Sequence, residues 1–475
     1  MLKMMIEVPE ELKSVVEAMR EMLSAVQAQM SLQRTGRCSY SAFERQVEER
    51  SAAIERAIHA AALAALDVDA PAVEINGVSH VRVLRGPATF QTRAGEVEVT
   101  RSLFRPAGAR GGDSVDLVAM RAGTISETWL PQAARAMAFL VQQVPSREAV
   151  DAAREMGRLP YTRASFERIG QAVGERYAQN EKKIDEELIL SFAVPSELAS
   201  VSVALDRVSI PVEEPRPRPV GRPRKDAPKN PIARVYRQAY CGTVTLHDSE
   251  GKALHTIRYG CMPDSDPDEL VHGMAGDVLA LRAAKSELRV ALLSDGAPEM
   301  KHRLDTAFEG AEFGVVIRLV DYWHLVEKLA VAAAVIATAA EPTSALLARW
   351  KMALLNQSSA RQNILTELRD SGKEHVRIGD EQPVHAAITY LENNAERMDY
   401  ATARRRKLPI GSGAVEATCK SLVTVRMKRS GCRWKQPSAD RIIRLRALAL
   451  SDRWNDAMEL TLHAPAVQVK EMWAA

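Results

Sequence analysis

Three acidic residues that are far apart in the chain lie where carboxylates are unusual. Asp206 interrupts an apolar, β-branched run, Asp295 ends a second apolar run, and Glu416 is the only acid in the basic stretch 408–435. An unpaired carboxylate in a buried strand is unfavourable by several kcal/mol, so such a residue is usually paired, capped or bound to a metal. Mg²⁺ and Mn²⁺ prefer oxygen ligands, and a pair of these ions can activate an attacking oxygen and stabilise a leaving one in phosphodiester chemistry.

The residues around Glu416 would complete such a site. A glycine-serine turn at 411–413 precedes Glu416 and would begin its helix. The candidate phosphate contacts are the cations that follow, Lys420, Arg426, Lys428 and Arg429. Considered alone, Glu416 could instead neutralise these cations, and Asp295 could belong to an ordinary Asp-Gly turn. A metal site is favoured only if the three acids come together.

A further acidic element follows the next apolar run. Asp321 and His324 come directly after the strand predicted at 314–319 and begin an apolar helical pattern. Asp321 could cap that helix, or it could compete with Asp295 as a metal ligand, because both residues end a strand. We prefer Asp295, where a strand, Asp-Gly and a helix follow one another. We expect Asp321 and His324 to support the site.

Apolar periodicity indicates the elements that would carry these residues, in a core at 196–325. The five expected strands are residues 198–211, 233–247, 252–259, 287–293 and 314–319. The first three form an antiparallel meander, and each of the last two is followed by a helix. This order predicts an α/β fold whose mixed sheet is flanked by helices. Residues 326–405 have a helical pattern throughout, and 406–475 would complete the core with the glutamate helix and a helical tail.

The N-terminal part is mostly helical in pattern, and we expect it to contain a DNA-binding region. Residues 1–70 indicate a helical hairpin or oligomerisation segment, or a part of the DNA-end-binding surface, and 71–123 indicate a small β-hairpin module and a joint. Residues 124–195 include two short helices around a glycine-containing turn. That pair resembles a helix-turn-helix, with Arg163 and Arg168 as candidate DNA contacts. Helix pairs of this kind also occur without DNA.

A proline-rich basic arm, residues 213–231, interrupts the predicted sheet. Its proline content excludes a helix interior or a central strand. A Gly-Arg-Pro core resembles an AT-hook, which lies in a narrow minor groove, and the candidate contacts are Arg222, Arg224 and Lys225. A flexible, solvated loop explains the same composition. In either case the arm would add salt-dependent affinity for phosphate.

Composition limits the class of protein. The chain has 475 residues, enough for roughly two to four domains, and its net charge of +3 is small, so affinity for nucleic acid must arise from local clusters. Its five cysteines form no Cys-x-x-Cys pair, which argues against a zinc ribbon or a disulfide framework. No apolar run is long enough to span a membrane, and acids near the N-terminus argue against a signal peptide. We expect a soluble, cytoplasmic protein with no membrane partner.

Four stretches around these acids resemble the ISKra4 family of bacterial insertion-sequence transposases, a DDE-class family that is related to Mutator-type elements. The matching stretches are VSVALDRVSI, LLSDGAPEM, VDYWHLVEKL and LPIGSGAVEATCKSLVTVRMKRSGCRW. The resemblance implies a ribonuclease H-like core with a helical insertion, and Asp206, Asp295 and Glu416 as ligands of two Mg²⁺ or Mn²⁺ ions. It also matches Asp321 and His324 to the D-x-x-H element that this group carries after its second acid.

The resemblance implies a function as well. A protein of this class binds the terminal inverted repeats of its element, cleaves the DNA and joins the 3′-hydroxyl ends to target DNA. We would expect it to act as a dimer or higher oligomer on double-stranded DNA in the bacterial nucleoid. The chain departs from many relatives at Arg207, where they have glycine after the first acid. Two alternatives remain, a ribonuclease H-like nuclease without strand transfer and a non-catalytic DNA-binding regulator derived from a transposase.

Overall fold

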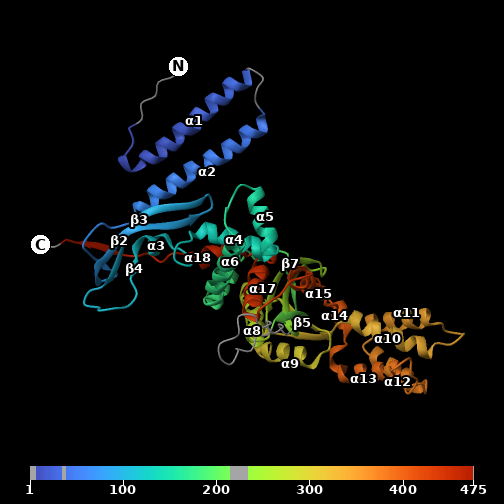
Figure 1. Ribbon diagram of the computed structural model, residues 1–475. Helices are drawn as coiled ribbons and strands as arrows, with labels where there is room; N and C mark the ends of the chain where they lie inside the picture. The colour runs from blue at the N-terminus through green and yellow to red at the C-terminus, as the bar shows by residue number, and fades with distance from the viewer. Residues whose placement is uncertain (1–6, 35–38, 214–233, 474–475) are drawn as a thin grey trace, which may run out of the picture. The chain divides into compact units, whose positions relative to one another are not determined.

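The structure is a computed structural model that describes residues 7–34, 39–213 and 234–473 (Figure 1). Contacts within the chain divide it into two compact units, which we describe separately. These units are residues 1–180 with 458–475, and residues 181–457. Within the described ranges, no helix is both long enough and apolar enough to cross a membrane.

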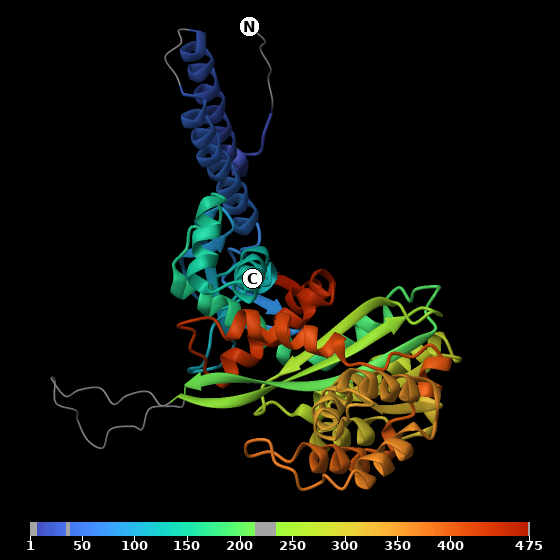
Figure 2. The same cartoon turned by 90° about the vertical axis from the view of Figure 1, so that its right-hand side faces the viewer.

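A long helical hairpin and a five-stranded sheet make up much of the first unit (Figures 1 and 2). Helices α1 (Lys13–Arg34) and α2 (Tyr40–Ala64) pack against each other, and α2 also contacts the sheet. The strands lie in the order β10-β1-β2-β3-β4, and neighbouring strands are antiparallel. Their bounds are β1 Ala72–Ile75, β2 Val78–Thr92, β3 Gly95–Pro106, β4 Val115–Asp116 and β10 Val469–Met472.

The edge strand β10 corrects the prediction of a helical C-terminal tail. The tail is helical in α17 (Gln436–Leu450) and α18 (Trp454–Leu462), but the chain then becomes extended and pairs with β1, with Ala72 opposite Met472. Pro465 disfavours continuation of a helix. A strand of four residues is too short for its periodicity to be recognised, and its partner lies near the other end of the chain.

The first unit also contains four helices between β4 and residue 180, together with the end of α18. The four helices are α3 Leu117–Ala122, α4 Pro131–Gln143, α5 Ser146–Glu155 and α6 Arg163–Ala178. Thr162 caps α6, because its hydroxyl accepts a hydrogen bond from the Ser165 backbone N–H at 3.2 Å. Ser146 is the first residue of α5. Its hydroxyl donates to Glu167 of α6 at 2.6 Å and so joins the two helices.

The second unit is built on a mixed five-stranded sheet in the order β7-β6-β5-β8-β9. Strands β5, β6 and β7 are antiparallel neighbours, whereas β8 is parallel to β5 and β9 is parallel to β8. The bounds are β5 Ser200–Glu213, β6 Arg234–His247, β7 Ala253–Cys261, β8 Arg289–Ser294 and β9 Val316–Val320. The predicted mixed α/β class is therefore confirmed in the sense of two sheets surrounded by many helices.

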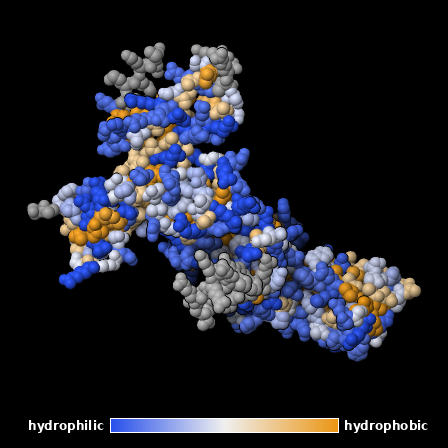
Figure 3. Space-filling model, in the orientation of Figure 1, coloured by the Kyte–Doolittle hydropathy of each residue, from blue (hydrophilic) through white to orange (hydrophobic). Residues whose placement is uncertain are grey.

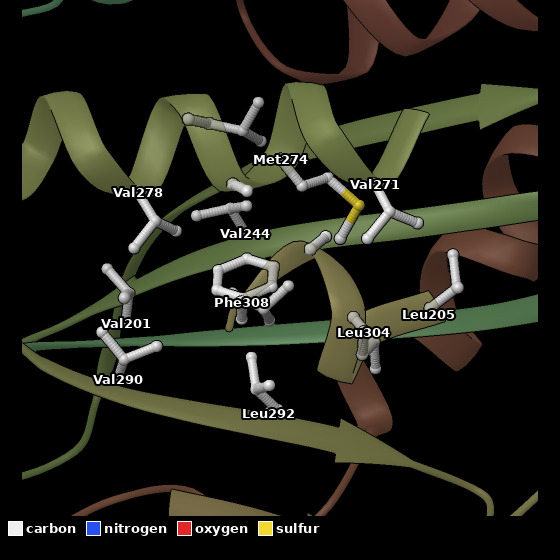
Figure 4. Packing of buried hydrophobic residues seen from close by; sticks show 14 of the residues in the cluster. Val201, Leu205, Val244, Val271, Met274, Val278, Val290, Leu292, Leu304 and Phe308 are labelled. Atoms are coloured by element: carbon white, nitrogen blue, oxygen red, sulfur yellow. The ribbon is translucent and has the colours of Figure 1, made fainter. Parts of the chain in front are cut away.

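One face of this sheet carries the main hydrophobic core. Helices α8 (Pro267–Ala284) and α9 (Pro298–Ala307) pack on it, and Leu205 of β5 lies in the same buried cluster as Met274 of α8 and Phe308 (Figure 4). Successive side chains of a strand point to opposite faces. The neighbour of Leu205 in sequence, Asp206, therefore points away from this core.

The opposite face is covered by the segment that carries the candidate glutamate. Helix α15 (Gly413–Thr418), the π-helical turn η4 (Cys419–Thr424) and α17 contact β5, β6 or β7. A π-helical turn inside a helix is rare and is often found at functional sites. The short helix α16 (Val425–Met427) follows it, and α7 (Glu181–Leu190) packs on α8.

A group of helices separates β9 from α15 in sequence (Figure 1). Their bounds are α10 Tyr322–Ile336, α11 Thr343–Asn356, α12 Ala360–Asp370, α13 Pro383–Asn393, the 3₁₀ turn Ala395–Arg397 and α14 Tyr400–Arg405. They bury apolar residues that include Trp350, Leu368 and Leu391. Apolar patches also lie on the visible surface of these helices (Figure 3). Met352 of α11 is one of their exposed apolar residues.

Candidate active site

Asp295 and Asp321 directly follow the carboxyl ends of β8 and β9, and Asp206 lies within the neighbouring strand β5, beyond its last residue paired with β8 but still opposite Cys241 of β6. The parallel pairing of β5 and β8 ends at Ala204 and Leu293, and two further residues along each strand lead to Asp206 and Asp295. The pairing of β8 and β9 ends at Ser294 and Val320, so Asp295 and Asp321 are the next residues. The Asp321 backbone N–H donates to the Ser294 carbonyl at 2.8 Å. Carboxyl ends of parallel strands are a common place for functional groups in α/β sheets.

Asp206 is half-buried on the face that η4 covers. Its Oδ2 accepts a hydrogen bond from the Cys419 thiol at 3.5 Å, and its Oδ1 accepts one from the Arg207 backbone N–H at 2.7 Å. A hydrogen bond with Cys241, together with burial, raises the pKa of the Cys419 thiol, so the thiol remains protonated and can donate. Cys419 thus links Asp206 to the helix that carries Glu416.

The unusual Arg207 does not cover the first acid. Its side chain points to the other face of the sheet, where the guanidinium lies 2.6 Å from Glu299 of α9. Glu299 also accepts a hydrogen bond from the Tyr240 hydroxyl at 2.5 Å. Strand alternation therefore separates the cation from the Asp206 carboxylate, and the departure from the Asp-Gly pattern leaves the acidic edge of the sheet intact.

Asp295 occupies a tight turn between β8 and α9. Its Oδ1 accepts a hydrogen bond from the Ala297 backbone N–H at 2.8 Å. Gly296 has a φ of +94°, and a β-carbon there would lie 3.0 Å from the Tyr390 hydroxyl, so this position requires glycine. Tyr390 of α13 donates to the Asp295 backbone carbonyl at 3.0 Å. The helical insertion therefore contributes directly to the position of Asp295.

Asp321 is fully buried, and both of its carboxylate oxygens bind protein donors. Oδ1 accepts a hydrogen bond from the His324 backbone N–H at 2.8 Å and so caps α10. Oδ2 accepts hydrogen bonds from the Ser412 hydroxyl at 2.7 Å and from the Ser412 backbone N–H. A buried carboxylate is stabilised by hydrogen bonds of this kind. Asp321 consequently fixes the start of α10 to the turn that begins the glutamate helix.

Glu416 lies in the first turn of α15 with an exposed side chain. The Ser412 hydroxyl is 3.2 Å from Glu416 Oε1, in addition to its contact with Asp321. One donor atom each of Asp321, His324 and Glu416 lies within 4.8 Å of the other two. A cavity of about 350 Å³ adjoins them and is also lined by Trp323.

The structure therefore brings three of the five predicted site residues, two acids and the histidine, into one close group. Among the residues that it describes, the close group of possible metal ligands consists of Asp321, His324 and Glu416, without Asp206 and Asp295. Asp295 is adjacent to Asp321 through the strand register, and Asp206 reaches the glutamate helix through Cys419. Three residues that contact the acids were not predicted from the sequence as part of the site: Tyr390, Cys419 and Ser412, through its hydroxyl.

The predicted phosphate contacts after Glu416 need one correction. Lys420, Lys428 and Arg429 are exposed, but Arg426 is only 4% exposed, and its guanidinium lies 4.8 Å from the centre of the Trp434 ring. A buried guanidinium over an aromatic face stabilises the fold and does not reach a phosphate in solvent. This burial corrects the expectation of an exposed Arg426, and its DNA-binding role stays a prediction.

The other predicted DNA contacts lie outside this group. Arg163 and Arg168 are exposed on α6 of the first unit, where Arg163 is also 2.9 Å from both Glu167 and the Ser146 hydroxyl. Arg222, Arg224 and Lys225 belong to the basic arm and lie outside the described residues.

Comparisons with known proteins give a limited result. No protein-family model matches the chain, and no curated protein matches it. Among solved structures, it is similar to the Drosophila P element transposase strand transfer complex, with 11% sequence identity and a TM-score of 0.23 over 69% of this chain and 80% of that chain. A TM-score of this size does not define a shared fold.

Proposed function

We propose that the chain is a DDE transposase of a bacterial insertion sequence, with a ribonuclease H-like core. The single observation that supports this proposal most is the strand register, which puts Asp206, Asp295 and Asp321 on three neighbouring strands near the carboxyl ends of β8 and β9, with Glu416 connected to Asp321 through Ser412. The strand order also supports it, since three antiparallel strands are followed by two parallel strands, each leading to an acid and a helix.

Asp206, Asp295 and Glu416 would hold two Mg²⁺ or Mn²⁺ ions. All three offer carboxylate oxygens, as hard cations require. Asp295 is preferred as the second ligand because it follows β8, which pairs directly with the strand of Asp206, whereas Asp321 follows the next strand, β9. When bound, such ions activate the attacking oxygen and stabilise the leaving oxygen of a phosphodiester.

The other residues of the site have supporting roles in this proposal. Asp321 and His324 fix the turn before Glu416 and so position its carboxylate. Lys420, Lys428 and Arg429 are exposed after Glu416 and would bind the phosphate backbone of the reacting strand. The chain would first direct water, and then the freed 3′-hydroxyl, to the phosphodiester.

The partner in this proposal is double-stranded DNA, both the transposon ends and the target. End recognition would involve Arg163 and Arg168, with the basic arm through Arg222, Arg224 and Lys225. Two ends must be joined in concert, so a homodimer or higher oligomer on DNA is part of the proposal. The reaction would take place in the bacterial nucleoid.

The proposal is tested with a DNA duplex that carries the sequences flanking the gene, in Mg²⁺ or Mn²⁺. The Asp295→Asn and Glu416→Gln variants should lose strand cleavage by at least about 100-fold, because each removes a charged ligand of the site. They should retain most of their affinity for the ends. Asp380→Asn and Glu309→Gln are matched controls at exposed positions and should cleave normally. Normal cleavage by Asp295→Asn would contradict the assignment.

A further inference from the structure

Asp321, His324 and Glu416 combine two carboxylates with an imidazole around one point. They come from the end of β9, the first turn of α10 and the first turn of α15. Their nearest donor atoms are within 4.8 Å of one another. Two ligands of one ion lie at most about 4.4 Å apart, because bonds to nitrogen and oxygen are about 2.0–2.2 Å long. A small rotation of the exposed Glu416 side chain would therefore bring all three to one ion.

The imidazole of His324 is placed as a metal ligand would be. Its Nδ1 is buried and has no hydrogen-bond partner, and it lies 3.4 Å from Asp321 Oδ1. An ion about 2.1 Å from both atoms would subtend an angle of roughly 110° at the metal, close to the tetrahedral value. A buried nitrogen without a partner is unfavourable, so a bound cation would also satisfy this atom.

The surroundings hold these donors in place. The Ser412 hydroxyl and backbone N–H orient Asp321 through Oδ2, and the His324 backbone N–H binds Oδ1 at 2.8 Å. Hydrogen bonds of this kind to ligating groups orient them and increase metal affinity. The adjoining cavity of about 350 Å³ leaves room for water molecules to complete the coordination.

We propose that Asp321, His324 and Glu416 form a site for one divalent transition-metal ion, beside the carboxylates of Asp206 and Asp295. The nitrogen ligand distinguishes it from an all-oxygen Mg²⁺ site, because imidazole suits Zn²⁺, Cu²⁺, Fe²⁺ and Ni²⁺. Mn²⁺ is more oxygen-preferring than these ions and serves only as a paramagnetic probe. Glu416 has two oxygens and can belong to both sites. This ion is additional to the two ions of the proposed cleavage site. It would bind to the chain alone, in the absence of DNA.

The probe is Mn²⁺ alone, added to the metal-free full chain. Pulsed electron paramagnetic resonance should detect a ¹⁴N coupling from a directly bound imidazole. His324→Gln should remove this coupling and weaken Mn²⁺ binding about 10-fold or more in calorimetry. The fold should remain intact in this variant, because the cap of α10 uses the backbone N–H of residue 324.

A matched variant identifies the histidine. His302 lies on α9 with an exposed side chain, and His302→Gln should keep both the ¹⁴N coupling and the Mn²⁺ affinity. A coupling that persists in His324→Gln, or the absence of any ¹⁴N coupling in the unmodified chain, would overturn the proposal. Glu416→Gln should weaken binding as well, and an unchanged affinity in that variant would also contradict it.

The outcomes separate this site from the proposed function. Asp206→Asn should abolish strand cleavage and preserve the ¹⁴N coupling, since Asp206 is outside the close group. Normal strand cleavage together with no nitrogen coupling would reject the transition-metal site alone. A nitrogen coupling without any cleavage would reject the transposase proposal and keep the site.

Discussion

The Ser412 hydroxyl donates a hydrogen bond of 2.7 Å to Asp321 Oδ2, although 91 residues separate the two in sequence. Helices α10 to α14 lie between them along the chain, so this contact closes the helical insertion at its base. The same hydroxyl is 3.2 Å from Glu416. The contact therefore relates the geometry of the insertion to the position of the candidate glutamate.

Ser412→Ala should disturb this position without removing a charged residue. We expect the free energy of unfolding to fall by about 1–3 kcal/mol, because a buried carboxylate loses a hydrogen bond. The rate constant of strand cleavage should fall while the affinity for DNA ends stays unchanged. A cleavage assay and a DNA-binding titration on the purified variant measure these two quantities. Ser358→Ala, at an exposed position, is the matched control. A loss of stability with a normal rate constant would show that Ser412 is structural only.

The two cations Arg426 and Lys428 should behave differently although both follow Glu416. Arg426→Ala removes a buried guanidinium from the Trp434 ring and should lower the free energy of unfolding by about 1–3 kcal/mol. Lys428→Ala should leave stability nearly unchanged. It should weaken DNA binding and reduce the slope of log affinity against log salt by about 1. Equal effects of both variants on stability would be inconsistent with their different burial.

The backbone conformation at position 296 and the closeness of Tyr390 both require glycine there. Its φ is +94°, and an added β-carbon would lie 3.0 Å from the Tyr390 hydroxyl. Gly296→Ala should lower the free energy of unfolding by about 1–3 kcal/mol and reduce cleavage, because Asp295 is displaced. Gly273→Ala, in the middle of α8 with open space around it, should be neutral or stabilise by up to about 1 kcal/mol. Urea denaturation compares the two variants.

The free energy of unfolding should fall when the pH drops below the ordinary pKa of a histidine side chain. Burial lowers the pKa of His247 from its ordinary value of 6.5, and the Ser202 hydroxyl lies 2.9 Å from its Nε2. The unfolded chain then binds more protons than the folded chain as the pH falls through 6.5, which favours unfolding. Urea midpoints at pH 5.5 and 7.5 should differ less for His247→Gln than for the unmodified chain. Burial also lowers the pKa of His255. The His247→Gln variant should therefore keep part of the pH dependence of stability.

The sequence was sufficient for the order of strands in the second unit, because apolar runs, turns and the acids at their ends are local features. The alternation of β5 also explains why Asp206 and Arg207 face opposite sides. The partners of the acids were not predictable in this way. Tyr390 and Ser412 reach Asp295 and Asp321 only after the insertion has folded, and no local pattern marks such contacts.

The burial of Arg426 and the strand β10 were both missed for the same physical reason, since periodicity does not report tertiary context. Arg426 follows a π-helical turn, which shifts the buried side of the helix relative to a regular α-helical pattern, so an apparently exposed cation becomes buried. Strand β10 is recognised only through its pairing with β1. In both places the backbone departs from what propensity favours.

The central claim is that this chain cleaves DNA ends and joins them to other DNA. The most direct measurement incubates the full chain with a labelled duplex carrying the gene's flanking sequences and a circular target plasmid in Mg²⁺ or Mn²⁺. We predict metal-dependent transfer of the labelled 3′ end into the plasmid, absent in Asp295→Asn and present in Asp380→Asn. Cleavage without any joined product, or joined product that is equally abundant with Asp295→Asn, would contradict the assignment.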